Sequence, residues 1–115
     1  MRSHKRIREI RRATRGFRFA AAAADQGAHV EVFLIDDAIH WAQAGMAEGV
    51  RASTGEHMKE MIDKLVANRC PIHVCKACVD RRHISPDELI DGAGISTSGD
   101  LVRMMVDPDY KVITF

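Results

Sequence analysis

Hydrophobic residues along the chain change repeatedly between extended and helical spacing. Short apolar stretches have the alternating or continuous pattern of strands, at residues 29–35, 71–75, 93–95 and 110–115. Helix-forming segments lie around them, at about residues 13–26, 38–44, 56–68, 76–82 and 99–106, with a further helix start at 85–88. Strands that alternate with helices predict an α/β domain with a mainly parallel sheet and helices on both faces.

Two of the predicted helices have a well-defined apolar face. The first carries Phe17, Ala20, Ala21 and Ala24 on one side, and Gly27 is placed to end it. Such small side chains imply close packing on a flat surface. The second of these helices, at about residues 56–68, has an apolar face made of Met58, Met61, Ile62, Leu65 and Val66.

Composition limits the classes of protein to consider. The chain has 115 residues, of which 46% are hydrophobic, enough for one domain with a real core. No apolar run approaches the roughly 18 residues needed to span a bilayer, so we expect no membrane partner. The net charge of +1 hides an uneven distribution. Residues 1–18 hold eight Lys and Arg against one acid, and acidic residues outnumber basic ones in the remainder.

The basic start of the chain has more than one interpretation. It is Arg-rich like a transit peptide, and Arg11-Arg12 before an alanine run has some likeness to a twin-arginine export signal. The favoured interpretation is a solvated, partly disordered basic segment at 1–12 that leads into a single domain at 13–115. Because that domain is acidic, a role in binding nucleic acid is not expected.

Three cysteines lie within nine residues, at Cys70, Cys75 and Cys78. They are too few and too close for a disulfide scaffold, which favours a reducing, cytoplasmic location. The last two form a Cys-x-x-Cys motif at a predicted strand-to-helix junction, where backbone N–H groups favour the thiolate. Cys75 is therefore the candidate nucleophile. His73 lies two residues before it, on the same strand face, and is a candidate to exchange a proton with the thiol.

Two other interpretations of the cysteines remain open. The spacing Cys70-x4-Cys75-x2-Cys78 is that of an iron–sulfur run, with His73 or His83 as further ligands for iron or zinc. However, a fourth cysteine is missing, and a strand of about five residues would hold Cys70 roughly 15 Å from Cys75. We therefore predict no metal and no other cofactor. In the third interpretation Cys70 and Cys78 are packing residues.

Several segments in a fixed order carry a family resemblance. They are residues 13–20, residues 27–37 with the sequence GAHVEVFLIDD, residues 72–78 followed by Arg81-Arg82, then Gly94-Ile95 and residues 111–115. Together they resemble the DsrE/DsrF-like family of sulfur-relay proteins, from about residue 11 to the C-terminus.

The resemblance implies a flavodoxin-like three-layer α/β fold of five strands that assembles into trimers or hexamers. It implies that a persulfide is accepted from a donor protein on a cysteine near subunit contacts and passed to an acceptor protein. Cys75 occupies the position of that carrier cysteine. Cys78 is variable in such proteins, so its role is a separate hypothesis: it either resolves the persulfide as a disulfide with Cys75 or simply packs.

The resemblance also suggests binding residues around the cysteine. Asp36 and Asp37 match an acidic loop at the same sheet edge, where they would orient a partner or His40, or merely end the strand. The basic pair Arg81 and Arg82 adds positive charge beside the cysteines, or consists of solvated helix residues.

Two positions depart from the family pattern. His83 replaces a glycine, so a predicted helix ends without the residue best suited to a left-handed conformation. The first family strand is degraded or missing, because residues 5–10 contain only two apolar residues. Its loss is expected to leave the neighbouring strands unpaired unless this segment or a partner chain fills the gap.

The sequence thus predicts a persulfide carrier or sulfurtransferase subunit that acts through Cys75. One alternative is a non-catalytic oligomeric module with the same fold, used for binding or regulation. The other is a metal-binding protein that uses the Cys and His cluster.

Overall fold

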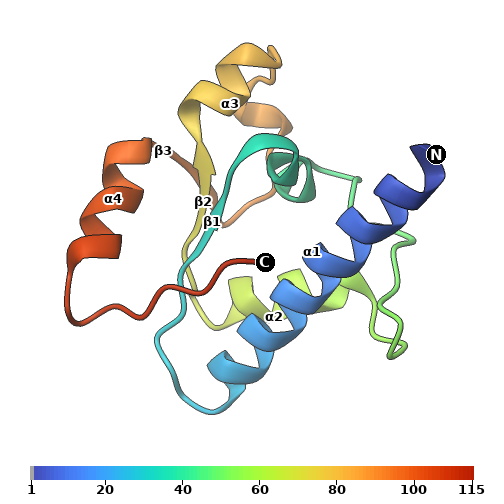
Figure 1. Cartoon of the computed structure of the whole chain (residues 1–115), viewed down its shortest axis with the longest axis horizontal. Helices are drawn as coiled ribbons and strands as arrows, with labels where there is room; N and C mark the ends of the chain where they lie inside the picture. The colour runs from blue at the N-terminus through green and yellow to red at the C-terminus, as the bar shows by residue number, and fades with distance from the viewer. Residues whose placement is uncertain (1) are drawn as a thin grey trace.

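A computed structural model describes the backbone of residues 2–115 and the side chains of residues 12–115. Three short strands alternate with helices along the chain (Figure 1). The elements are α1 (Arg2–Asp25), β1 (Val32–Leu34), the 3-10 helix η1 (Asp36–Ala42), α2 (Met58–Ala67), β2 (Ile72–Cys75), α3 (Lys76–Arg81), the 3-10 turn η2 (Pro86–Glu88), β3 (Ala93–Ser96) and α4 (Ser98–Val106).

The three strands form one parallel sheet in the order β1-β2-β3. Val74 at its centre is in register with Leu34 on one side and Ile95 on the other. In Figure 1 the sheet runs between the α1–α2 pair on one side and α4 on the other. The predicted α/β class with a parallel sheet is confirmed.

The core lies between the sheet and the α1–α2 pair. The predicted helix faces are the ones that are buried, with Val66 and Ala20 only partly covered at their margins. Buried residues from these elements include Phe17, Ala21, Ala24, Met58, Met61, Ile62, Leu65, Ile72 and Val74. Each large side chain among them contributes about 1.5–3 kcal/mol by leaving water. The alanines bring α1 close to α2, as their size predicts.

The N-terminal helix is longer than its hydrophobic pattern predicts. It begins at Arg2 instead of near Ala13, so the basic residues continue the helix and do not form a disordered start. Arg and Lys have high helix propensity, which explains why charge does not interrupt it. It ends as expected, because Gly27 adopts φ +87° and its N–H bonds to the carbonyl of Ala24.

The missing first strand does not leave a gap. β1 pairs directly with β2 from Val32 to Leu34, and β2 pairs with β3, so each of the three described strands has a partner. The described residues form three strands where the resemblance implied five. Within the described part of the chain, the polar segment before residue 11 is helical, which removes one of the two strands.

The other lost strand is at the C-terminus. Residues 110–115 were predicted to be extended and paired, but the segment has no strand structure and is exposed. It runs from below α4 towards α1 (Figure 1), where the ring of Phe115 lies 5.9 Å from that of Phe19 and covers Gly16. Its first residue, Tyr110, donates a hydrogen bond to Glu31. Side-chain contacts, and not strand pairing, therefore hold this segment against the domain.

Other boundaries differ by a few residues. The first predicted strand is shorter, and the helix start at Ser85 makes only one 3-10 turn although its capping box with Glu88 is formed. Both differences concern the ends of elements, which are the least sharply defined part of a helix or strand. No helix among the described residues is long and apolar enough to cross a membrane.

Candidate functional site

The candidate site lies where the carboxyl ends of β1 and β2 meet. Because the two strands are parallel, the residues that follow them emerge at the same edge of the sheet. Asp36 and Asp37 begin η1 directly after β1, while Cys75 ends β2 and caps α3. Cys78 follows in the first turn of α3. The structure therefore brings the two predicted cysteines and the two predicted carboxylates together.

The two thiols are neighbours with different exposure. Cys75 is 6% exposed, and Cys78 is partly buried against the core. No cysteine is in a disulfide. Burial and the hydrogen-bonded Cys75 thiol raise the pKa of Cys78, and the backbone N–H of Asp36 opposes this by bonding to its sulfur. Cys78 is therefore a thiol at rest.

Asp36 contacts Cys78 through both its backbone and its side chain. Its N–H donates to Cys78 Sγ at 3.2 Å, and Cys78 Sγ lies 4.0 Å from Asp36 Oδ1. The residue adopts φ +51°, a left-handed conformation that aspartate tolerates better than most non-glycine residues. The N–H and the carboxylate of one residue thus both face the same sulfur.

Arg82 fastens η1 to the end of α3. One guanidinium nitrogen donates to Asp37 Oδ1 at 2.9 Å, and the other donates to the carbonyl oxygen of Cys78 at 3.2 Å. The bond to Asp37 raises the pKa of Arg82, so the guanidinium stays charged throughout the accessible pH range. Arg82 thus positions the loop that carries Asp36 relative to the helix that carries Cys78.

Two predicted binding residues take other positions. His40 lies in η1, where Nδ1 is 3.0 Å from Gln43 Oε1. Arg81 is exposed in the last turn of α3. Neither has a hydrogen bond to a cysteine among those the structure describes. Their association with the site rests on chain proximity alone.

His73 belongs to a different cluster from the cysteines. Nδ1 lies 2.8 Å from Ser96 Oγ, and Nε2 lies 2.8 Å from Glu31 Oε1. The ring also stacks on Phe33, with 5.6 Å between ring centroids. Both ring nitrogens are thus engaged away from the thiol, so this arrangement does not provide the proton exchange with Cys75 that strand periodicity suggested.

Sequence reasoning missed the partners of His73. Glu31 comes from the segment before β1 and Ser96 from the end of β3, while Tyr110, from beyond α4, donates a hydrogen bond to Glu31. The bond from Tyr110 is the largest influence that lowers the pKa of Glu31, with smaller contributions from His73 and His29. One available signal was the alternation of residues 29–35, which placed Glu31 and Phe33 on one strand face.

Cys70 lies away from the other two cysteines. It is buried before the start of β2, at the opposite end from Cys75, with its thiol 3.9 Å from the carbonyl of Asn68. It packs in the core, as one of the interpretations proposed. Among the described residues, no group of three or more His, Cys, Asp or Glu side chains is arranged to hold a metal ion.

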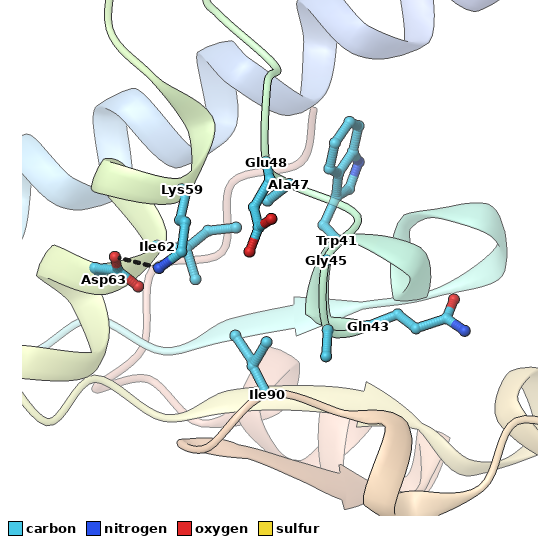
Figure 2. A pocket seen from close by; sticks show the side chains of 10 residues that line it. Trp41, Gln43, Gly45, Ala47, Glu48, Lys59, Ile62, Asp63 and Ile90 are labelled. Atoms are coloured by element: carbon cyan, nitrogen blue, oxygen red, sulfur yellow. Dashed lines mark hydrogen bonds and ion pairs between the residues drawn. The ribbon is translucent and has the colours of Figure 1, made fainter.

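A separate small pocket lies between η1 and α2 (Figure 2). Its volume is about 140 Å³, and Trp41, Glu48 and Ile90 are among its lining residues. Figure 2 shows Lys59 at its edge, ion-paired with Asp63 at 2.8 Å. None of the predicted site residues lines this pocket, so the thiols do not share it.

Comparison with known proteins identifies the family of this chain. The model of the DsrE/DsrF-like family matches residues 8–115. The chain belongs to this family. Protein YchN of Escherichia coli K12 is 35% identical over 100 residues, which are 85% of this chain and 81% of YchN. An uncharacterized protein of Methanopyrus kandleri is 26% identical over 101 residues, 88% of this chain and 80% of that protein.

The same family relationship appears in three dimensions. The crystal structure of the E. coli YchN protein superposes with a TM-score of 0.71 at 31% identity, covering 89% of this chain and 85% of YchN. The family match begins at residue 8, inside α1, so the long N-terminal helix lies largely within the DsrE/DsrF-like region. The predicted resemblance and fold are confirmed.

Proposed function

We propose that this protein is a cytoplasmic sulfur-relay component that carries sulfur as a persulfide on Cys75. The observation that carries the proposal is the position of Cys75 in a DsrE/DsrF-like chain. It ends the central strand beside a second thiol, at the sheet edge where η1 and α3 meet. The free state of all three cysteines fits a reducing compartment.

The proposed reaction is transfer of a sulfane sulfur between thiols. The Cys75 thiolate attacks the outer sulfur of a donor persulfide, R–S–SH. The donor's S–S bond breaks, the donor leaves as a thiolate, and Cys75–S–SH forms. An acceptor thiolate then attacks the same outer sulfur and restores the Cys75 thiolate. Neither step needs an external oxidant or reductant.

The surroundings of Cys75 limit which donors can react. Because only 6% of the residue is exposed, the donor sulfur has to be small or has to protrude from its carrier. Exposed charged side chains in the elements that carry or flank Cys75 would guide donor and acceptor proteins. Arg81 of α3 and Asp37 of η1 are the candidates on this chain. This proposal assigns the partners to proteins that present a persulfide or a thiol on an extended segment.

We further propose that the chain works as a homo-oligomer, a trimer or hexamer as the resemblance implies. Helix α4 buries none of its residues, and large apolar side chains there and in the C-terminal segment are exposed. Val106 is 74% exposed and Ile113 is 66% exposed. Apolar surface of this kind on a single chain is typical of protein contacts.

Intact mass spectrometry after incubation with glutathione persulfide tests the carrier proposal. We expect wild type to gain the mass of one sulfur atom, and Cys75→Ser to gain none. Cys70→Ser is the matched control, because its thiol is buried at the other end of β2, and it should gain sulfur like wild type.

Two results would contradict the carrier proposal. Equal sulfur gain in Cys75→Ser and wild type would place the sulfur elsewhere. No gain in either wild type or Cys78→Ser, with glutathione persulfide or inorganic polysulfide, would favour the non-catalytic binding module.

A further inference from the structure

Cys78 has more polar contacts than a packing residue needs. Its sulfur accepts the N–H of Asp36 at 3.2 Å, approaches the carboxylate of the same residue at 4.0 Å, and interacts with the Cys75 thiol. Its backbone carbonyl is held by Arg82 at 3.2 Å. Cys70 supplies the contrast within this chain, because its thiol has only a weak contact of 3.9 Å to a backbone carbonyl. Cys78 is therefore placed as a reactive partner of Cys75.

The spacing of the two cysteines suits an intramolecular disulfide. Helical positions three apart have Cβ atoms about 5–6 Å from each other. A disulfide brings Cβ atoms to about 3.5–4.5 Å and accepts Cα separations of about 4.4–6.8 Å. Cys75 lies before the first helical residue and has extended backbone angles, φ −60° and ψ 121°. A small backbone rotation at this junction brings the two Cβ atoms from helical spacing to disulfide spacing, while the rest of α3 stays in place.

We propose that Cys75 and Cys78 are a dithiol–disulfide pair in which Cys78 resolves the Cys75 persulfide and releases its outer sulfur as sulfide. This inference rests on the function proposed above and names the fate of the carried sulfur. When no acceptor thiol is present, the pair discharges the sulfur without a second protein.

The step balances within the site. The Cys78 sulfur attacks Cys75 Sγ, the inner sulfur of the persulfide, and a Cys75–Cys78 disulfide forms. The persulfide S–S bond breaks, and the outer sulfur leaves as HS⁻, which takes up the Cys78 proton as H₂S. The sulfane sulfur is reduced to sulfide while the two cysteines are oxidised to the disulfide. A dithiol such as dithiothreitol then reduces the disulfide and is itself oxidised.

The local geometry assigns an order to the two cysteines. In this order Cys75 takes the donor sulfur, and Cys78, whose sulfur is held by Asp36, acts second. The Asp36 carboxylate lies where it can receive the Cys78 proton, and the N–H of the same residue stabilises negative charge on the sulfur. Arg82, paired with Asp37, keeps η1 and α3 in this relation. Asp36 thus supports Cys78 as the second nucleophile.

The experiment follows sulfide release and protein mass after a single loading with glutathione persulfide, with excess donor and oxygen removed. In wild type we expect the sulfur adduct to decay to a species two hydrogens lighter than the reduced protein, with one sulfide released per chain. In Cys78→Ser the adduct should persist, and sulfide release should slow by about tenfold or more. Cys70→Ser should behave as wild type.

Tryptic peptides identify the disulfide, because Lys76 separates the two cysteines. Cleavage gives residues 70–76 and residues 77–81 as different peptides. Alkylation before digestion should leave these two peptides linked in wild type and in Cys70→Ser, which excludes a bond from Cys70. The same linked pair should form when reduced wild type is equilibrated with oxidised glutathione, a measurement that needs no persulfide.

The outcomes separate this inference from the proposed function. Normal sulfur gain with equally fast sulfide release in Cys78→Ser and wild type overturns the inference and leaves the carrier intact. Absence of the linked peptides at every glutathione ratio also overturns it. If neither wild type nor Cys78→Ser gains sulfur and no sulfide is released, the carrier function and the resolving step both fail, whatever the glutathione result.

Discussion

At the scale of single residues, the structure separates two groups that the sequence placed together. The thiols of Cys75 and Cys78 lie with Asp36 at the sheet edge, while His73 is bound between Glu31 and Ser96. Strand periodicity put His73 and Cys75 on the same face, but it carried no information about which side chains would reach the histidine. Hydrogen bonding to a carboxylate from another segment decided its role.

The Glu31 network predicts a specific dependence of stability on pH. The bond from Tyr110 is the main cause that lowers the pKa of Glu31 below the ordinary glutamate value. Its stabilising effect is therefore complete above the ordinary value and is lost as the pH falls through the lowered one. We expect Glu31→Gln to reduce the free energy of unfolding by about 1–2 kcal/mol at pH 7.

Urea unfolding of wild type and Glu31→Gln between pH 3 and 7 would measure this difference. It should shrink as the solution becomes acidic, because wild type then loses the same charge. Glu48→Gln, in an exposed loop, should show little difference at any of these pH values. A constant difference across the range would show that Glu31 acts through packing instead of charge.

At the scale of elements, the ends of helices and strands decided where the site formed. Each strand contributes its reactive residues only at its carboxyl end, and the parallel pairing of β1 with β2 places those ends side by side. Helix α3 has only six residues and ends in a strained conformation, since His83 has φ +55°. The sequence predicted this feature, because a histidine occupies the position of the family's glycine.

Replacement of His83 by glycine should therefore stabilise the protein. Glycine adopts left-handed angles without the clash that costs other residues about 1–2 kcal/mol. Part of that gain is lost because glycine gives up more conformational entropy on folding. We expect His83→Gly to increase the free energy of unfolding by up to about 1 kcal/mol. Chemical denaturation gives the value directly.

Arg81→Gly, two residues earlier, is the matched control. It places glycine inside α3, where the residue costs about 1 kcal/mol relative to a good helix former. A loss of stability in both variants would mean that the His83 ring makes a favourable contact larger than its backbone strain.

At the scale of the whole molecule, a single chain leaves much apolar surface uncovered. The sheet of the described residues has three strands, the C-terminal segment is exposed and has no regular secondary structure, and α4 has no buried residue. The core between the sheet and the α1–α2 pair is well covered, so the exposed surface is concentrated elsewhere. This asymmetry supports the proposed self-association through α4 and the C-terminal segment.

Substitution of Val106 by aspartate tests this surface. The side chain is 74% exposed in the single chain, so the change should hardly affect its folding. If α4 lies in a contact between copies, a buried unpaired charge there would disfavour assembly by several kcal/mol. Size-exclusion chromatography with light scattering should show a trimer or hexamer for wild type and smaller species for Val106→Asp.

Ala22→Asp serves as the control, because Ala22 is exposed on α1, a different element. It should keep the mass of wild type. A wild-type chain that elutes as a monomer at all concentrations would overturn the oligomer proposal.

The sequence by itself determined the α/β class, the buried helix faces and the thiol pair at a strand end. These follow from local spacing, which fixes whether residues share a face or a turn. Tertiary structure alone decided that β1 closes onto β2, that Phe115 packs near Phe19, and that Glu31 takes His73 away from Cys75. Such pairings join segments far apart in the chain, and many partners satisfy the same local pattern. Only the packed chain selects the ones that bury apolar surface and leave polar groups bonded.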